Sequence, residues 1–557
     1  MNSISTISSN PLAYRALAAA FHAEGTEVLF TLLGDGNMHW AASLTELGVR
    51  GIYARHEHAA CAMATMYARA TRKVGVASVT CGPGLTQIMT ALTTAAQARI
   101  PLVVFAGESP MHAGFYNQHV DQRPLVVATG AHYITAHSLQ RMTDYVREAF
   151  FLARTERMPV VLGVPLDLQK QMLPKPYSYE PSSSVIPHYG RMSANRADVD
   201  RAVEAIEQSK KIVLVAGLGA LHSQAQADCE ALADACGGML ATTLPARGMF
   251  DHHPFGIGIS GGYARATGRR LMQEADLLIA VGASLAHFTA DGGKLYRCAR
   301  TIQIDTQPLG LKHGRKAADI YVRADAREGV RAILERLSKD QPERSWRSDA
   351  LAEEIAQAPA DDTSFPPQPG VIDPREAVAA IDRVVPKDWE VINSSGHCAY
   401  FTAQLRGRKP ENFNVIREFG AIGNGLSYAM GAAAGKPERT IVLLDGDGSL
   451  LMHAQELETV RRHGLKLLIC VLNDGAYGSE IHKMHSDGIS AEGATFGRGD
   501  LAAVARGFGL RGRMINGVDQ FGPAFEEFLN AGPGAELWDI HIADNVTTPV
   551  MRAHMSH

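Results

Sequence analysis

The chain has 557 residues, more than a single hydrophobic core holds, and is expected to divide into about three domains. With 46% apolar and 20% charged residues, a net charge of −4 and no basic tract, it has an ordinary globular composition, and no nucleic-acid partner is expected. Seven scattered cysteines without CxxC spacing, no apolar run of about 18 residues and a Ser-rich start argue against disulfides, zinc, a membrane span and secretion, so a cytoplasmic location is expected.

The first part of the chain alternates helical and strand patterns, which predicts a doubly wound α/β domain over residues 1–175. The predicted elements are a helix over 12–24, a strand over 28–33, a helix over 39–47, a strand over 51–54, a helix from about 55 to 69, and strands over 75–80, 100–107 and 160–164. Glu57 lies in the first turn of its helix, where the helix dipole favours a carboxylate, and this alone would explain it.

Two further α/β domains are predicted beyond this one. Residues 172–195 and 337–370 are rich in Pro and Ser or charge and have little apolar periodicity, so we interpret them as linkers. Residues 196–337 contain strand patterns that end in glycine turns and form a predicted central domain, and residues 371–557 form the third. The predicted fold class is therefore α/β, with three doubly wound parallel-sheet domains.

Two acidic turns follow neighbouring strands of the third domain. The apolar run 441–444 predicts a buried parallel strand that leads to Asp447, and a second strand over 467–472 leads to Asp474. A helix predicted over 451–463 connects them, so the crossover brings both turns to one edge of the sheet, where open parallel sheets bind ligands. Two carboxylates beside glycine-rich backbone suit Mg²⁺ that carries a diphosphate.

The turns Gly446-Asp447-Gly448 and Asn473-Asp474-Gly475 resemble the thiamine diphosphate signature, in which Gly-Asp-Gly is followed one strand later by Asn-Asn or a close variant. The resemblance implies that Mg²⁺ is held by Asp447, Asp474 and the main-chain carbonyl of Ala476. Asp474 stands where this signature usually has asparagine, which adds one negative charge at the metal.

Motifs in the first domain extend the resemblance to the acetolactate synthase, pyruvate oxidase and 2-oxo acid decarboxylase superfamily. They are Arg55-His-Glu57, Tyr67-Ala-Arg69, Val79-Thr-Cys-Gly-Pro-Gly84 and Pro101-Leu-Val103. The family's catalytic glutamate matches Glu57, which is implied to hydrogen-bond N1′ of the cofactor's aminopyrimidine and so to promote loss of the proton from thiazolium C2.

The same resemblance implies the other cofactor contacts. Ile422 matches the bulky apolar residue beneath the thiazolium, a position that an ordinary core isoleucine would also fill. The implied cofactor-binding residues are Glu57, Pro83, Gly396, His397, Ile422, Gly446, Gly448, Ser449 and Gly475. In the central domain, residues 282–288 lack the arginines and aspartates that FAD-containing acetolactate synthases carry there, so FAD is not expected.

Polar residues near thiazolium C2 are expected to distinguish the family's reactions. Asp35 in a Gly-Asp-Gly-Asn turn, His112 in a polar loop and Glu480, six residues after Asp474, resemble catalytic residues of 2-oxo acid decarboxylases. With Glu57 they favour decarboxylation of a 2-oxo acid, with carboligation also possible. A turn residue, an exposed loop residue and a first-turn helix charge would explain Asp35, His112 and Glu480 equally.

Two alternatives stay open: an acetolactate synthase-like carboligase, and a catalytically silent regulatory or assembly relative. A scaffold would not need to keep both Glu57 and the acidic pair, which argues against the second. In relatives the residues that match Glu57 and Asp447 meet across a subunit interface. The resemblance therefore implies a homodimer or homotetramer with the active site at that interface, a small 2-oxo acid as substrate, and no membrane partner.

Overall fold

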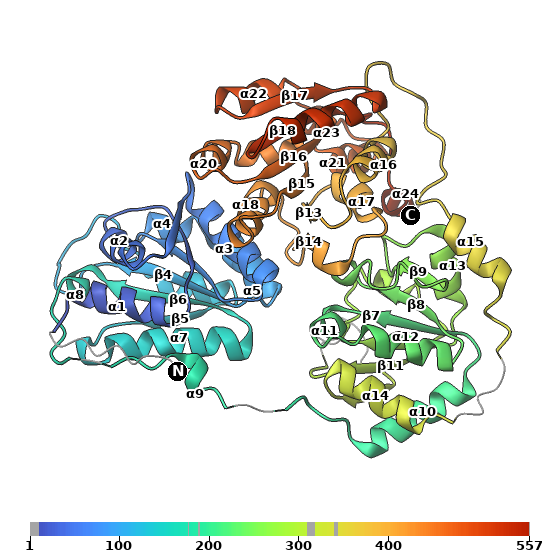
Figure 1. Ribbon diagram of the computed structural model, residues 1–557, viewed down its shortest axis with the longest axis horizontal. Coiled ribbons are helices and arrows are strands. Elements are labelled where there is room, and N and C mark those ends of the chain that lie inside the picture. Colours follow the sequence, from blue (N-terminus) through green and yellow to red (C-terminus); the bar gives the residue numbers. More distant parts are fainter. Residues whose placement is uncertain (1–9, 177, 188–189, 309–317, 339–343, 556–557) are drawn as a thin grey trace.

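The computed structural model describes residues 10–176, 178–187, 190–308, 318–338 and 344–555. The expectations for the extreme N-terminus and for parts of both linkers (177, 188–189 and 339–343) lie outside these residues. Three six-stranded sheets follow one another along the chain, and all their strand pairs are parallel. The predicted fold class, three doubly wound α/β units, is confirmed (Figure 1).

The first sheet has the order β2-β1-β3-β4-β6-β5. Its elements are α1 (Ala13–Ala23), β1 (Val28–Thr31), α2 (Met38–Glu46), β2 (Arg50–Tyr53), α3 (Glu57–Thr71), β3 (Gly75–Val79), α4 (Pro83–Thr86), α5 (Met89–Gln97), β4 (Leu102–Glu108), α6 (Gln122–Ala128), β5 (His132–Thr135), α7 (Met142–Glu156), β6 (Pro159–Pro165), α8 (Leu166–Gln169) and α9 (Ser182–Val185). The elements predicted from the sequence are present, with ends shifted by at most two residues.

The central sheet has the order β12-β11-β10-β7-β8-β9. Its elements are α10 (Arg196–Gln208), β7 (Ile212–Ala216), α11 (Leu218–His222), α12 (Gln226–Ala235), β8 (Met239–Thr242), β9 (Gly256–Ile259), α13 (Ala266–Glu274), β10 (Leu277–Val281), β11 (Arg300–Asp305), β12 (Ile320–Arg323), α14 (Ala326–Arg336) and α15 (Asp349–Gln357). Two helices fall within the segments predicted as linkers, α9 in the first and α15 in the second, because each buries a small part of its surface against a neighbouring domain.

The third sheet has the order β14-β13-β15-β16-β18-β17. Its elements are α16 (Pro374–Val384), β13 (Glu390–Asn393), α17 (Cys398–Ala403), β14 (Phe413–Val415), α18 (Gly425–Gly435), β15 (Ile441–Gly446), α19 (Asp447–Met452), α20 (Glu456–Arg462), β16 (Leu467–Asn473), α21 (Gly478–Ser486), α22 (Leu501–Gly507), β17 (Arg511–Ile515), α23 (Phe521–Asn530), β18 (Ala535–His541) and α24 (Pro549–Met555).

The single helix predicted over 451–463 is wrong, because the structure has two helices, α19 and α20, separated by residues 453–455. His453 leaves the helical conformation at φ −136° and ψ 32°. Its side chain is buried against the first domain, where its ring stacks on His58 with 4.8 Å between centroids. Three residues later the buried carboxylate of Glu456 accepts a 3.0 Å hydrogen bond from the backbone N–H of Arg55. The break therefore allows this segment to contact α3.

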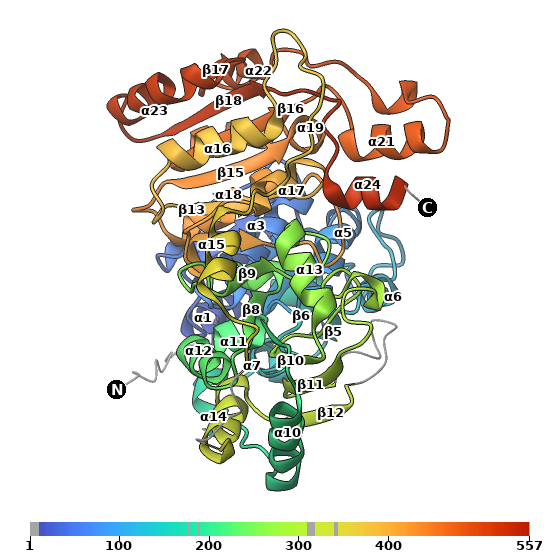
Figure 2. The same cartoon turned by 90° about the vertical axis from the view of Figure 1, so that its right-hand side faces the viewer.

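Helices α3 and α18 join the first domain to the third (Figure 1). Their backbones approach so closely that a Cβ on Gly431 would lie 2.1 Å from the carbonyl oxygen of Met63. Buried residues of both domains form one continuous core across this junction. Among the described residues, this shared core contains side chains of the first and third domains and none of the central domain. The last helix, α24, packs against the central domain (Figure 2), where a Cβ on Gly262 would lie 3.1 Å from Val550.

All seven cysteines are free thiols, and six of them are buried. Within the part of the chain that the structure describes, no helix combines the length and the apolar character needed to cross a membrane.

Candidate active site

The predicted acidic pair lies at the carboxyl edge of the third sheet. Asp447 is the first residue of α19 and Asp474 follows β16, and the two strands that carry them are paired through Gly446 and Leu472. The Asp447 carboxylate accepts a 2.9 Å hydrogen bond from the N–H of Gly475, and Asp474 accepts one of 3.2 Å from the N–H of Ala476. Both side chains are buried, at 2% and 9% exposure, so the two carboxyl groups face each other away from water.

Without a cation, the burial of these two ionised carboxylates would raise the free energy of the folded state. Burial raises the pKa of Asp447 to about 6, and burial together with the charge of Asp447 holds the pKa of Asp474 well above its usual range. A divalent cation between them would remove both penalties, and carboxylate and carbonyl oxygens are the donors that Mg²⁺ prefers. Among the described residues, no group of three or more His, Cys, Asp or Glu side chains is arranged to hold a metal. The acidic donors at this edge are thus the two carboxylates of Asp447 and Asp474, and their chemistry fits Mg²⁺.

Two histidine rings and glycine backbone lie next to this acidic pair. His397 is half-buried, but its Nε2 atom is buried and has no hydrogen-bond partner among the described residues, and this burial lowers its pKa to about 3 and keeps it neutral. Its ring packs edge-on against His482 at 4.9 Å, whose Nε2 is also buried without a partner. A Cβ on Gly478 would lie 2.4 Å from Asp474 Oδ2 and 2.9 Å from His397 Nδ1. Two unpartnered donors beside a carboxylate pair fit an anion bound through a metal, such as a diphosphate.

The loop that carries Ile422 lies against the same edge. Ser449 Oγ accepts a 2.9 Å hydrogen bond from the N–H of Gly423, and a Cβ on Gly396 would lie 3.7 Å from the Ile422 side chain. Gly448 is close to Tyr477, since its Cβ would lie 2.6 Å from that ring. The structure thus brings together the cofactor-binding residues predicted in the third domain, which are Gly396, His397, Ile422, Gly446, Gly448, Ser449 and Gly475, with the metal-site residues Asp447, Asp474 and Ala476.

A third buried carboxylate, which the sequence analysis did not single out, lies close to the acidic pair of Asp447 and Asp474. Asp445 is fully buried, and burial raises its pKa to about 6. Its Oδ1 accepts a 2.9 Å hydrogen bond from the N–H of Gly446, and its Oδ2 is so close to α18 that a Cβ on Gly425 would lie 2.3 Å away. An acidic residue ending the apolar run before Gly446 was a signal for it.

The first sheet carries the second group of predicted residues. Glu57 is the first residue of α3, whose amino end is capped by His56 Nδ1 accepting from the N–H of His58 at 3.1 Å. A Cβ on Gly84 would lie 3.5 Å from Glu57 Oε1, so Glu57 lies beside the turn in which Pro83 opens α4. Glu57 and Pro83 therefore share the carboxyl edge of this sheet.

Asp35 lies on a turn at the same edge, directly after β1, with an exposed side chain. The Asp35 carboxylate is close enough to Cys81 and Tyr116 for its charge to raise the pKa of both groups. Asp35 therefore lies near the turn that contains Pro83 and near the loop after β4. Asn37 builds this turn and was missed as a structural residue. Fully buried, it accepts from the N–H of Gly34 at 2.8 Å and donates to Ser78 Oγ at 2.9 Å.

Among the described residues of the single chain, no hydrogen bond or ion pair brings His112 or Glu480 to these groups. His112 is exposed on the loop between β4 and α6. Glu480 lies on α21 with a side chain that is 53% exposed, and it forms a 3.0 Å ion pair with Lys483. Their predicted catalytic roles stay predictions.

The two groups of residues are joined within one chain by the junction of α3 and α18. His58, next to Glu57, makes a 2.6 Å hydrogen bond between its Nε2 and Oδ1 of Asn424, two residues after Ile422. Burial lowers the pKa of His58, which keeps the imidazole neutral. The amino ends of the two helices that carry the predicted catalytic and thiazolium residues are therefore held together.

Comparisons with known proteins agree with this arrangement. Three family profiles match the chain: the N-terminal TPP binding domain of thiamine pyrophosphate enzymes over residues 13–147, their central domain over 199–333 and their C-terminal TPP binding domain over 394–537. The chain belongs to the thiamine pyrophosphate enzyme family. The N-terminal and C-terminal matches contain Glu57 and the acidic pair, respectively.

The relatives found for this family member include acetolactate synthases. The acetolactate synthase large subunit of Parasynechococcus marenigrum is 29% identical over 550 residues, which cover 95% of this chain and 87% of the relative. The acetolactate synthase isozyme 2 large subunit of Escherichia coli is 29% identical over 529 residues, 92% of this chain and 93% of the relative. Chloroplastic acetolactate synthase 1 of Nicotiana tabacum is 30% identical over 487 residues, 83% of this chain and 70% of the relative.

Proposed function

We propose that this protein is a thiamine diphosphate- and Mg²⁺-dependent carboligase of the acetolactate synthase type. It would release CO₂ from one 2-oxo acid and join the remaining acyl fragment to the carbonyl carbon of a second carbonyl compound. The observation that carries the proposal is the buried pair Asp447 and Asp474 with raised pKa values beside His397, a site suited to a metal-bound diphosphate. The relatives named acetolactate synthase favour this alternative over the simple decarboxylation predicted from the loop motifs.

Each group of residues would have a defined task. When bound, thiamine diphosphate supplies carbanion chemistry at thiazolium C2. Asp447, Asp474 and the carbonyl of Ala476 would hold Mg²⁺, and neutral His397 would donate a hydrogen bond to a diphosphate oxygen. Glu57, fixed at the first turn of α3, would hydrogen-bond the aminopyrimidine and promote proton transfer from C2.

Simple decarboxylation is the second candidate, and Asp35 supports it. Its exposed carboxyl group lies on the turn after β1, near Tyr116, where the protonated acid would donate a proton to the carbon that has lost CO₂ and become the carboxylate. The other two residues of the decarboxylase motif support it less, since Glu480 is paired with Lys483 and His112 is exposed in the single chain. The proposal gives FAD no role, because residues 282–288 lack the charged residues found in FAD-containing relatives.

Product analysis tests the choice between the two. The protein with Mg²⁺, thiamine diphosphate and a panel of 2-oxo acids, pyruvate included, is followed by NMR. A hydroxyketone product such as acetolactate is expected, and Glu480→Gln should leave the product ratio unchanged. Free aldehyde as the main product, with slower release in Glu480→Gln, would overturn the carboligase proposal in favour of the decarboxylase.

We further propose a homodimer or homotetramer whose active site combines Glu57 of one chain with Asp447 of another. Exposed apolar side chains at the carboxyl edges of the first and third sheets support a covering partner: Leu33, Met38, Met111, Phe115, Phe419, Leu451, Met452 and Phe496. The Glu57→Gln and Asp447→Asn variants, each inactive alone, are mixed, dissociated or unfolded, and allowed to reassemble. Half of the randomly formed dimers are hybrids, and each hybrid has one intact site out of two. The mixture should therefore regain about a quarter of wild-type activity. A site contained in one chain would give no recovery.

A further inference from the structure

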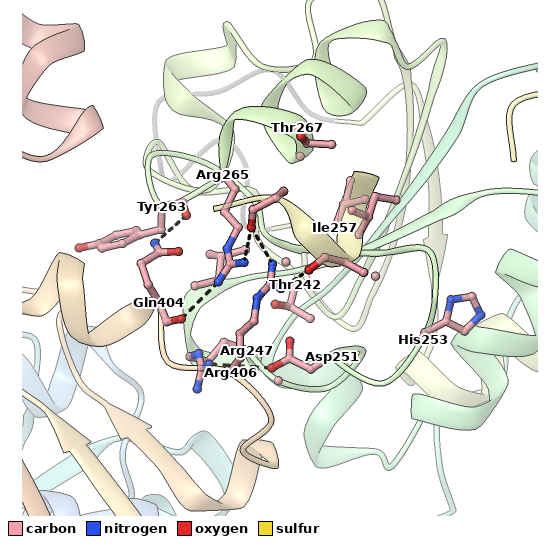
Figure 3. Close-up of a pocket in the computed structure, with 18 of the residues that line it drawn as sticks. Thr242, Arg247, Asp251, His253, Ile257, Tyr263, Arg265, Thr267, Gln404 and Arg406 are labelled. Carbon is pink, nitrogen blue, oxygen red and sulfur yellow. Dashed lines mark hydrogen bonds and ion pairs between the residues drawn. The ribbon is translucent and has the colours of Figure 1, made fainter. Parts of the chain in front are cut away.

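A cavity of about 230 Å³ lies between the central and third domains, away from the residues of the candidate active site (Figure 3). Its walls come from the end of β8 and the segment 247–259, from the start of α13, from the last turn of α15 with Ala358 after it, and from the end of α17 with residues 404–406 after it. The cavity opens to the surface. It is smaller than the pockets of roughly 300 Å³ and more that hold drug-sized ligands, so a small ligand would fill it.

Positive charge dominates the lining. Arg247, Arg265 and Arg406 come from three separate segments, and Asp251 is the one carboxylate among the lining residues. Asp251 already accepts a 3.1 Å hydrogen bond from the N–H of Gly407 and lies 3.9 Å from Arg247 Nη2. The two lining histidines pair with carboxylates outside the cavity, His252 with Glu230 and His253 with Asp234, each at 3.1 Å.

Two of the arginines are held side by side by neutral acceptors. Arg265 Nη1 and Arg406 Nη2 both donate to the carbonyl oxygen of Ala358, at 3.1 and 3.4 Å. Their remaining hydrogen bonds go to the carbonyl oxygens of Gln404 and Ala356. Two guanidinium groups that converge on one carbonyl repel each other, and carbonyls do not neutralise them. Figure 3 shows both side chains directed into the space between the two domains.

The third arginine is buried with an unused donor. Arg247 is 3% exposed, its guanidinium lies 4.4 Å from the ring centre of Phe413, and its Nη1 has no hydrogen-bond partner. Burial lowers its pKa to about 10. The nearby Arg408 is also buried, at 1% exposure, but its charge and donors have partners. It pairs with Asp382 at 3.2 Å and donates hydrogen bonds to three backbone carbonyls. Among the described residues, Arg247 has the 3.9 Å ion pair with Asp251 but no side-chain hydrogen bond of this kind.

We propose that this cavity binds a small phosphate-class oxyanion, either inorganic phosphate or the phosphate group of a small phosphomonoester. Guanidinium groups are the side chains best matched to phosphate oxygens. Three of them on separate segments suit the several oxygens of a tetrahedral anion better than the two coplanar oxygens of a carboxylate. The bound anion ties the central domain to the third domain, and the remainder of an ester would extend through the opening to solvent.

Calorimetric titration of the full chain, saturated with thiamine diphosphate and Mg²⁺, tests the proposal. Saturation keeps phosphate out of the cofactor site. The probes are inorganic phosphate, glycerol 3-phosphate and acetate at constant ionic strength. Saturable binding of one phosphate per chain is expected, weakened at least tenfold in Arg265→Gln and in Arg406→Gln. Equal or tighter binding of glycerol 3-phosphate identifies an ester as the ligand, and binding of phosphate alone identifies the free ion.

Arg270→Gln is the matched control. Arg270 lies on α13 outside the cavity, half-exposed and paired with Glu274 and Glu354, so its loss changes the net charge by the same amount. An equal loss of affinity in Arg270→Gln, acetate binding as tight as phosphate, or no saturable binding would overturn the proposal. If the variants do not fold, selenate soaked into wild-type crystals decides it: anomalous density between Arg265 and Arg406 supports the site, and its absence there refutes it.

Discussion

The acidic pair should make metal binding release protons. Asp447, with its pKa raised to about 6 by burial, is about half protonated at pH 6, and burial together with the charge of Asp447 holds the pKa of Asp474 well above its usual range. A metal ion requires both as carboxylates, so binding of Mg²⁺ and thiamine diphosphate at pH 6 should release protons from this pair, about half a proton per chain from Asp447 and a further fraction from Asp474. Asp474→Asn removes one of the two acids and the charged neighbour of the other, and should therefore lower the number of protons released.

Calorimetry in buffers of different ionisation enthalpy measures this number directly. Protons that the cofactor itself releases are common to both proteins and cancel in the difference. Asp487→Asn, which replaces an exposed aspartate at the end of α21, is the matched control and should behave as wild type. The same release from wild type and Asp474→Asn would refute the assignment of a protonated, metal-free acidic pair.

Stability should follow the same linkage. The folded-state pKa of Asp447 lies above its unfolded value, so ionisation of Asp447 destabilises the metal-free fold. This destabilisation is absent below pH 4, grows between pH 4 and pH 6, and is complete above pH 6. The shift from 3.8 to about 6 corresponds to about 3 kcal/mol against the metal-free fold above pH 6. Added Mg²⁺ and thiamine diphosphate should therefore raise the melting temperature more at pH 7.5 than at pH 5. An equal rise at both pH values would contradict this reasoning.

Three further predictions concern the two helix ends and their junction. Glu57→Gln should abolish turnover and hydrogen–deuterium exchange at thiazolium C2 while thiamine diphosphate still binds, and unchanged exchange would show that Glu57 is not the catalytic glutamate. Gly431→Leu should destabilise the protein by about 2 kcal/mol or more in thermal unfolding, because a Cβ there meets the Met63 carbonyl at 2.1 Å, whereas Gly522→Ala, in open space, should not. Burial lowers the pKa of His453 to about 4, so the junction should lose stability as pH falls from about 6.5 towards 4, and His453→Asn should flatten this dependence in melting curves.

The sheets were predictable because their strands are buried on both faces and appear as apolar runs that end in glycine turns. Residues 441–444 and 467–472 are such runs, and the turns after them carry the metal pair. The break between α19 and α20 was not predictable, because residues 451–463 have helical periodicity. Only the contact of His453 with His58, nearly 400 positions earlier, explains it. In the same way Asn37 and Asp445 gain their roles from partners far away in the sequence, Asn37 from Ser78 on β3 and Asp445 from Ser394 after β13.

The arrangement of α19 links the metal pair to the catalytic helix. Asp447 begins α19 and His453 ends it, stacked on His58 next to Glu57. His58 in turn bonds Asn424, which opens α18 just after Ile422. The amino ends of α3 and α18, beside Glu57 and Ile422, thus meet the carboxyl end of α19 at one buried polar junction, and α19 carries Asp447 at its other end. Because neutral His58 and His453 pack within a low-dielectric core, charging either imidazole would disturb all three helix ends together, so the geometry of the two half-sites depends on the same few contacts.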